Sequence, residues 1–203
     1  MKRRVFAALY DGMNKGTEAA GIRGERHDLL AQAQGTTIEI GAGTGLNVEH
    51  YPGSVTRLVL AEPDEHMRRR LARRAGVVRP AAELIDAGAG ELPFPDATFD
   101  TAVVTWVLCS VPDQRLALQE IARVVKPNGH LLFLEHVRSD DPQVAKWQDR
   151  IRPLSNHLAG CNPNRETLAA IRASQFEVES VRHGAVPKAP RFERPMIVGT
   201  ARR

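Results

Sequence analysis

Residues 37–45 read Thr37-Ile38-Glu39-Ile40-Gly41-Ala42-Gly43-Thr44-Gly45, an apolar stretch of strand length that runs into three glycines. Glycines at this position allow the backbone to turn sharply and to approach a ligand closely, and a helix that follows offers free N–H groups. The pattern by itself is compatible with a nucleotide-type ligand or with a tight turn of purely structural use. A dinucleotide fingerprint places its third glycine one residue later. Glu39, two residues before Gly41, suits a ligand with an amino group and would repel a pyrophosphate.

Apolar runs of strand length recur along the chain, with helical patterns between the early ones. This alternation predicts an α/β fold, a Rossmann-like sheet of seven mostly parallel strands with helices on both faces. A Gly/Pro-rich stretch from Gly184 to Pro195 joins the last two runs in place of a helix, so the last strand is expected to be antiparallel. The predicted strands span residues 36–40, 55–61, 82–85, 98–107, 130–137, 176–181 and 195–201, and the predicted helices 45–50, 64–75 and 112–125.

The chain length favours a single domain. With 203 residues, 42% of them hydrophobic, the chain can bury one substantial core but is short for two domains and a linker. Residues 1–35 are predicted to form a helical cap, with Thr17 or Glu18 near a helix start and Gly35 as its stop. Residues 140–172 are expected to form a helical insertion on the substrate side.

Several features predict a soluble, cytoplasmic protein. The start of the chain imitates a signal peptide, but its apolar run stops at Asp11. No stretch approaches the roughly 18 apolar residues of a membrane span. Cys109 and Cys161 are the only cysteines and lack C-x-x-C spacing, so reduced thiols are expected. The seven histidines are scattered without paired ligand spacing, and no metal site is predicted.

The net charge of +4 comes partly from one run of arginines on and after a predicted helix. A solvated helix face is the simplest interpretation of this run. The alternative is peripheral contact with anionic lipid headgroups or acidic substrates. Nucleic acid is not expected as a partner, because no aromatic residues interleave with the arginines. The run consists of Arg68, Arg69, Arg70, Arg73, Arg74 and Arg79.

Glu62 ends the second predicted strand, about 20 residues after Gly41. A carboxylate at this point of a Rossmann-like sheet can accept hydrogen bonds from both hydroxyls of a ribose. A helix N-cap or a surface charge is the alternative, and the glycine loop nearby favours the ribose.

Four segments together resemble the class I S-adenosylmethionine-dependent methyltransferases, notably the branch with the ubiquinone and menaquinone C-methyltransferases. They read E-I-G-A-G-T-G from Glu39, A-E-P from Ala61, L-P-F-P-D-A-T-F-D from Leu92 and V-V-K-P-N-G-H-L-L-F-L-E-H from Val124. The resemblance covers about Thr36 to His136 and implies S-adenosylmethionine as cofactor, with S-adenosylhomocysteine as its product. It assigns cofactor contacts to Glu39, Gly41, Gly43, Gly45, Glu62, Pro63, Gly90, Glu91, Val107 and Leu108.

Each contact has an implied partner on the cofactor. Glu39 would meet the methionine amino group, Glu62 the ribose and Pro63 the adenine, while Val107 and Leu108 would flank the methionine end. The link through Gly90 and Glu91 would border the adenine ring. This chain has Ala89-Gly90 where the family usually has Asp-Ala, so the adenine amine would lack its carboxylate acceptor.

The carboxyl half is similar to thiol methyltransferases and to bacterial phosphatidylethanolamine N-methyltransferases. The similarity rests on Leu134-Glu135-His136-Val137, on Trp147, and on residues 160–167, which read G-C-N-P-N-R-E-T. It implies a thiol or another small apolar nucleophile as acceptor. A phospholipid amine and a quinone-type carbon are the alternatives within enzymes, and a regulatory protein that binds the cofactor without turnover is the alternative outside them. Oligomeric state is left open.

Methyl transfer is an in-line displacement, so positioning the acceptor supplies much of the acceleration and a general base is optional. His136, after the fifth predicted strand, is the candidate base, although it could equally cap the strand. Glu135 could orient His136 or cap a helix. The residues expected to bind the acceptor are Trp106, Cys109, Glu135, Trp147, Asn164 and Arg165. Trp106 and Trp147 would wall the pocket, and Asn164 and Arg165 could instead cap a helix that begins near Thr167.

Overall fold

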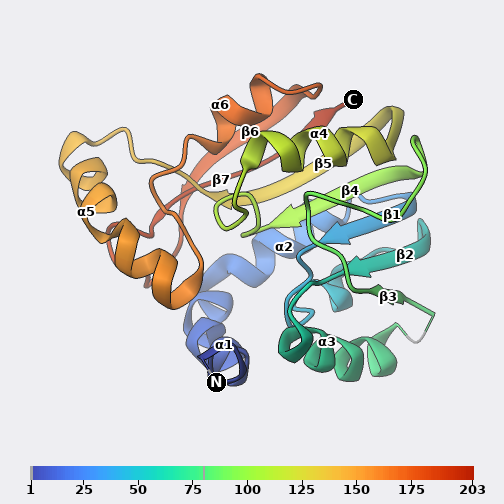
Figure 1. Cartoon of the computed structure of the whole chain (residues 1–203), viewed down its shortest axis with the longest axis horizontal. Coiled ribbons are helices and arrows are strands. Elements are labelled where there is room, and N and C mark those ends of the chain that lie inside the picture. The colour runs from blue at the N-terminus through green and yellow to red at the C-terminus, as the bar shows by residue number, and fades with distance from the viewer. Residues whose placement is uncertain (1, 80) are drawn as a thin grey trace.

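The computed structural model describes residues 2–79 and 81–203. All seven strands form one sheet, in the order β3-β2-β1-β4-β5-β7-β6, and Figure 1 shows it with helices packed around it. The predicted α/β class and mostly parallel sheet are confirmed. The strands are β1 (Gly35–Ile40), β2 (Val55–Ala61), β3 (Glu83–Ile85), β4 (Phe99–Thr105), β5 (Val125–His136), β6 (Glu177–Ala185) and β7 (Pro195–Arg202). The helices are α1 (Lys2–Thr17), η1 (Glu18–Ile22), α2 (Arg23–Leu30), η2 (Val48–His50), α3 (Glu65–Val78), α4 (Gln114–Val124), α5 (Pro142–Ala159) and α6 (Thr167–Arg172).

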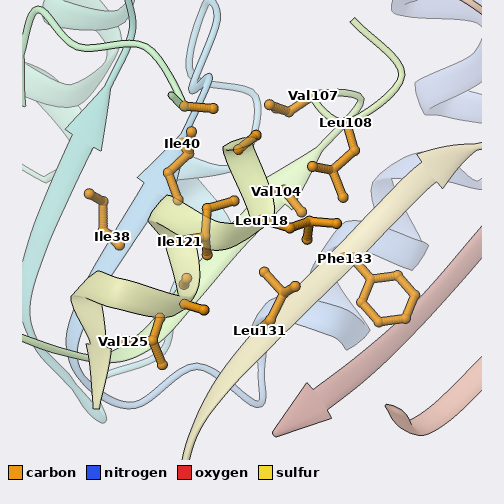
Figure 2. Close-up of a cluster of buried hydrophobic side chains, with 14 of the residues drawn as sticks. Ile38, Ile40, Val104, Val107, Leu108, Leu118, Ile121, Val125, Leu131 and Phe133 are labelled. Carbon is orange, nitrogen blue, oxygen red and sulfur yellow. The ribbon is translucent and has the colours of Figure 1, made fainter. Parts of the chain in front are cut away.

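Alternate residues of the central strands supply two separate hydrophobic cores. Ile38 and Ile40 of β1 join the cluster under α4 and α6, which also holds Leu118 and Ile121 (Figure 2). The intervening positions of neighbouring strands pack with α2 and α3 in the second cluster. Strands buried on both faces read as continuous apolar runs, which is why they were recognisable in the sequence.

The end of the sheet reverses direction as predicted. β7 is antiparallel to β5 and to β6, and β6 and β7 form a hairpin through residues 186–194. No helix separates them, because the Gly/Pro-rich stretch cannot sustain one.

The N-terminal helices begin earlier than predicted. A helix start near Thr17 or Glu18 is wrong, since α1 begins at Lys2 and continues into the π-helical turn η1. The Thr17 hydroxyl donates to the Asn14 carbonyl 2.8 Å away instead of capping a new helix. The actual break is at Gly21, whose φ of 145° turns the chain into α2.

Two other expectations differ from the structure in extent. The helix predicted over 45–50 is reduced to the short 3-10 turn η2. β4 ends at Thr105, two residues early, because Trp106 adopts a φ of 60°, which non-glycine residues rarely adopt. Over the described ranges, no helix has the length and apolar character needed to cross a membrane.

Candidate functional site

The carboxyl ends of the parallel strands meet at one edge of the sheet and bring the predicted site residues together. The glycine loop follows β1, Glu62 follows β2, and the segment Trp106–Cys109 follows β4. β1 pairs with β2 on one side and with β4 on the other. In doubly wound sheets this edge is where ligands bind.

The glycine loop is tightly packed at its first glycine and open at its second. Gly41 has a φ of 67°, and a Cβ there would lie 2.6 Å from Cγ2 of Val107. Gly43 has a φ of 57°, and its nearest neighbour to a Cβ would be 4.0 Å away. The loop therefore presses against the segment after β4 at Gly41, whereas Gly43 has no such close contact.

Glu39 lies beneath this loop with only 1% of its surface exposed. Its carboxylate accepts hydrogen bonds from Asn47 Nδ2 and from the Tyr51 hydroxyl, each at 2.8 Å. Burial raises the pKa of Glu39 to about 7, against the lowering effect of these two hydrogen bonds and of Arg26. A ligand ammonium at this place would favour the ionised carboxylate.

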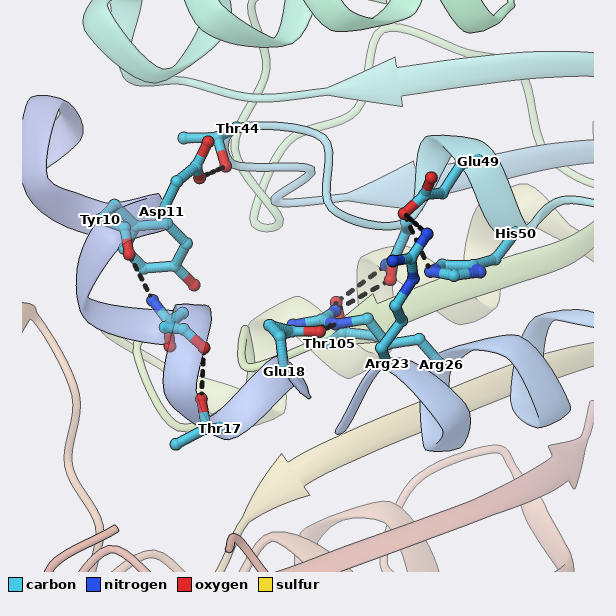
Figure 3. A network of polar contacts seen from close by, with 12 residues as sticks. Tyr10, Asp11, Thr17, Glu18, Arg23, Arg26, Thr44, Glu49, His50 and Thr105 are labelled. Atoms are coloured by element: carbon cyan, nitrogen blue, oxygen red, sulfur yellow. Dashed lines mark hydrogen bonds and ion pairs between the residues drawn. The ribbon is translucent and has the colours of Figure 1, made fainter. Parts of the chain in front are cut away.

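Arg26 of α2 is joined to the same network through Asn47, although no sequence pattern predicted it. Figure 3 shows Arg26 beside Glu18 and Thr105. Its side chain is 3% exposed. Nη1 donates to Asn47 Oδ1 at 2.8 Å and to Thr105 Oγ1 at 3.1 Å, and Nε donates to Glu18. A buried guanidinium beside Glu39 supplies the positive partner for a ligand carboxylate.

Glu62 lies directly after β2, beside the glycine loop. Its side chain is mostly buried, and its carboxylate accepts from the N–H of Gly43 and the N–H of Asp64, each at 2.8 Å. Burial raises its pKa, while these backbone hydrogen bonds lower it. Each oxygen keeps a lone pair for a hydroxyl. Pro63 is exposed next to it.

The link after β3 is exposed at Gly90 and Glu91, whereas Ala89 and Leu92 are buried. The Leu92 N–H is held by Glu120 of α4 at 2.8 Å. Gly90 and Glu91 thus border the sheet edge with free surface, and Ala89 offers no polar side chain for an adenine amine.

The N-terminal helix closes over the glycine loop. Asp11 of α1 accepts from the Thr44 hydroxyl and pairs with Arg74 at 2.9 Å. Tyr10 lines a cavity of about 20 Å³ together with the loop, Arg26 and Thr105. Burial raises the pKa of Tyr10 to about 12, so the phenol stays neutral. This volume holds about one water molecule, and Tyr10 of α1 forms part of its wall.

The donor set fits an adenosyl amino acid. Glu39 can meet an ammonium, Arg26 a carboxylate and Glu62 a ribose, and the open face of Gly43 lies between them. These are the groups of the cofactor that the sequence resemblance implies.

The predicted acceptor residues Trp106 and Cys109 lie around the imidazole of His136, at the end of β5. The ring stacks on Trp106 with centroids 4.1 Å apart. Its Nδ1 lies 3.6 Å from Cys161 Sγ and 3.9 Å from Cys109 Sγ. Both cysteines are free thiols, as predicted. The expectation of no metal site rested on spacing along the chain, and the structure brings these three ligand-type groups together from separate segments.

Two residues of the predicted site are structural. Glu135 is fully buried, and its carboxylate accepts from the N–H groups of Val107, Leu108 and Cys109 at 2.8–3.2 Å. It orders the turn after β4 and does not face an acceptor. Both Val107 and Leu108 belong to the hydrophobic core, and the Val107 side chain also lies against Gly41 of the glycine loop.

The predicted contributions of α5 and the following loop also need correction. Trp147 is 59% exposed and does not form a pocket wall with Trp106. Asn164 donates to Asp149, and Arg165 donates to the Leu108 carbonyl at 2.7 Å. Neither caps α6, whose N-cap position makes no side-chain hydrogen bond. Asn164 ties the loop to α5, and Arg165 ties it to the turn after β4.

Sequence reasoning missed several site residues for different reasons. Thr105 could have been found, because it ends a strand next to the glycine loop. Asn47 and Tyr51 come after that loop in the chain and reach Glu39 only through its folding. Tyr10 and Arg26 reach the edge because α1 and α2 pack on it. Cys161 lies in the segment 160–167, but the sequence did not indicate that it meets His136. The missed residues are Tyr10, Arg26, Asn47, Tyr51, Thr105 and Cys161.

Comparisons with known proteins agree with this geometry. Residues 38–133 match the family model described as a methyltransferase domain. Thiol S-methyltransferase TMT1B of Rattus norvegicus is 34% identical over 180 residues, covering 86% of this chain and 67% of the relative. Phosphatidylethanolamine N-methyltransferase of Cereibacter sphaeroides is 29% identical and covers 74% of each chain. A SAM-dependent methyltransferase structure from Thermotoga maritima has a TM-score of 0.73 at 20% identity, covering 98% of this chain and 97% of its own.

Proposed function

Because this chain belongs to the S-adenosylmethionine-dependent methyltransferases, we propose that it transfers the methyl group to the sulfur of a small-molecule thiol. The observation that carries this proposal is the identity of 34% with a thiol S-methyltransferase, over 86% of the chain. A match over 86% of the chain spans the segments that hold Cys109, His136 and Cys161.

The cofactor would be held by residues at the carboxyl edge. Glu39 and Arg26 would bind its amino acid end, Glu62 its ribose, and Pro63, Gly90 and Glu91 would border the adenine. When bound, the cofactor supplies a methyl group activated on a sulfonium. The chain's own task is to hold the acceptor in line with that methyl and to exclude water.

The acceptor side suits a nucleophile that needs little help from a base. The Glu135 carboxylate already accepts hydrogen bonds from three backbone N–H groups, so it is not available as a base. His136 Nδ1 faces the thiols of Cys161 and Cys109. A thiol is already partly ionised near neutral pH. An unactivated carbon acceptor would need stronger base catalysis than these groups provide.

The test is a labelled-methyl assay with S-adenosylmethionine and a panel of acceptors: alkyl and aryl thiols, phosphatidylethanolamine vesicles and reduced quinones. We expect label on the sulfur of at least one thiol. The Glu62→Ala variant is the control for cofactor-dependent turnover, and Glu83→Ala, a surface carboxylate on β3, is its matched partner. Label only on the lipid amine or on the quinol would contradict the thiol proposal.

A second candidate is transfer to a phospholipid amine at a membrane surface. Its support is a stripe on α1, where Val5, Leu9 and Met13 are more than half exposed at a spacing of four residues. Exposed apolar faces of this kind dock on lipid. Figure 1 shows α1 at the end of the molecule toward which the arrows of β1, β2 and β4 point.

The arginine run on α3 contributes less to such a surface than its sequence predicts. Arg68 binds Asp86 and the Glu62 carbonyl, Arg69 pairs with Glu65, and Arg74 binds Asp11. These cations already have intramolecular partners. Co-sedimentation with anionic vesicles tests the membrane proposal: Leu9→Asp should abolish binding, and Val77→Asp, on the exposed side of α3, should leave it intact. Equal binding by both variants would exclude α1 as the docking face.

A further inference from the structure

Three side chains of metal-ligand type converge at the acceptor side, although they are far apart in the sequence. Cys109 lies in the turn after β4, His136 ends β5, and Cys161 lies in the loop between α5 and α6. Their ligand atoms, two Sγ and one imidazole nitrogen, all lie within 4.8 Å of one another. Within the described chain, this is the one such group of three or more.

We propose that Cys109, His136 and Cys161 bind a Zn²⁺ ion whose fourth position receives the sulfur of the acceptor. The inference rests on the proposed function for the identity of the acceptor, but the metal site itself stands on the three protein ligands.

The distances agree with a tetrahedral site. Bonds of about 2.3 Å to sulfur and about 2.0–2.1 Å to nitrogen, at tetrahedral angles, hold a sulfur and a nitrogen ligand about 3.5 Å apart. The observed separations from His136 Nδ1 are 3.6 Å to Cys161 Sγ and 3.9 Å to Cys109 Sγ. These two separations exceed the tetrahedral value by at most a few tenths of an ångström, and the two sulfur atoms lie within 4.8 Å of each other.

The surrounding contacts fix the ligands before any ion binds. The Cys109 N–H donates to Glu135, and its carbonyl accepts from the backbone N–H of Asn162 at 2.9 Å and from its side chain at 3.2 Å. Cys109 and the residue after Cys161 are thus tied together. The His136 ring is held by stacking on Trp106.

The ligand types select the ion and its use. Thiolate and imidazole ligands favour zinc over magnesium or calcium. A structural zinc has four protein ligands, whereas three ligands leave a position for water or substrate. Cys109 follows Val107 by two residues in the turn after β4, and Val107 packs against Gly41 of the cofactor loop. This short connection along the chain is why we place a coordinated acceptor on the side of the methyl donor.

The reaction balances without a redox partner. On coordination the acceptor thiol loses its proton to solvent, because a zinc-bound thiol is deprotonated. Its sulfur lone pair forms the new bond to the methyl carbon while the bond from that carbon to the sulfonium sulfur breaks. Thiolate and sulfonium become two neutral thioethers, and the zinc keeps its charge. The methylated sulfur is a weaker ligand than a thiolate and leaves.

The test is metal binding by the whole chain, kept reduced and stripped with a chelator. We expect one equivalent of Zn²⁺ by elemental analysis after reloading, and a thiolate-to-cobalt charge-transfer band with tetrahedral visible bands when Co²⁺ is added. His136→Gln and Cys161→Ser should weaken Zn²⁺ binding at least tenfold. His130→Gln, on the same strand as His136, is the matched control and should bind as the wild type does.

The outcomes separate this inference from the proposed function. Stabilisation of each variant by S-adenosylhomocysteine shows that it has folded. No cobalt band, or equal zinc binding by wild type and His136→Gln, would overturn the metal site, even if thiols are methylated. One bound zinc with loss of binding in both variants would uphold the site, even if thiols are not acceptors. A Cys109–Cys161 disulfide that persists under reductant would also overturn it.

Discussion

Glu39→Gln should change the stability of this protein in a manner that depends on pH. The carboxyl is buried under the glycine loop, and burial raises its pKa from the ordinary value of 4.5 to about 7. A glutamine keeps the shape and can still accept the hydrogen bond from Asn47. The substitution therefore removes the ionisation while leaving most of the packing in place.

The magnitude follows from the difference in pKa between the folded and unfolded states. A rise from 4.5 to about 7, at about 1.4 kcal/mol for each pH unit, corresponds to about 3 kcal/mol. The folded state holds the Glu39 proton more tightly than the unfolded state does. The stabilisation from this proton is therefore fully present below the unfolded pKa of 4.5, and it is lost as pH rises toward 7. Glutamine does not titrate and escapes this loss.

The assay is urea unfolding of both proteins without cofactor between about pH 5 and about pH 8, where the free energy of unfolding is compared at each pH. We expect the free energy of unfolding of the variant to rise relative to that of the wild type as pH rises, by up to about 3 kcal/mol across the range. Glu177→Gln, on an exposed position, is the control and should show no such trend. A difference between Glu39→Gln and wild type that stays constant with pH would refute the assignment of a buried, weakly acidic carboxyl.

Three further predictions concern the loop and its cover. Gly41→Ala should lower the free energy of unfolding by about 2–4 kcal/mol, because it adds left-handed backbone strain and a clash with Val107. Urea titration measures this loss, and Gly53→Ala, which meets no neighbour, is the control. An unchanged free energy of unfolding would mean that the loop can move to make room. Glu62→Ala should weaken S-adenosylhomocysteine binding roughly hundredfold by calorimetry, since two charge-assisted hydrogen bonds are lost, and unchanged affinity would remove the ribose assignment. Asp11→Ala should speed cofactor dissociation about tenfold in stopped-flow, because α1 loses its contacts with Thr44 and Arg74; an unchanged rate would show that α1 does not limit release.

Local sequence patterns were sufficient for the sheet and for the cofactor edge. The strands are buried on both faces and read as apolar runs, and the helices between them require parallel pairing. The glycine loop and Glu62 follow strands directly, so their place at the carboxyl edge follows from the topology alone. The resemblance to methyltransferases across Thr36 to His136 depended on these same segments.

The acceptor side depended on contacts that no local pattern reports. Glu135 and His136 are neighbours in the sequence, yet one turns into the core toward three N–H groups while the other faces the site, because side chains alternate along a strand. Trp147 was predicted to form a wall of the pocket, but its side chain lies on the solvent side of α5.

The sequence by itself determined the fold and the class of reaction, since both depend on short segments whose geometry is fixed by neighbouring residues. Only the tertiary structure brought Arg26 of α2 to Glu39 and joined Cys161 to Cys109 and His136. These groups are separated by tens of residues along the chain. Their meeting is decided by how helices and loops pack on the sheet edge, a long-range property that periodicity and spacing do not encode.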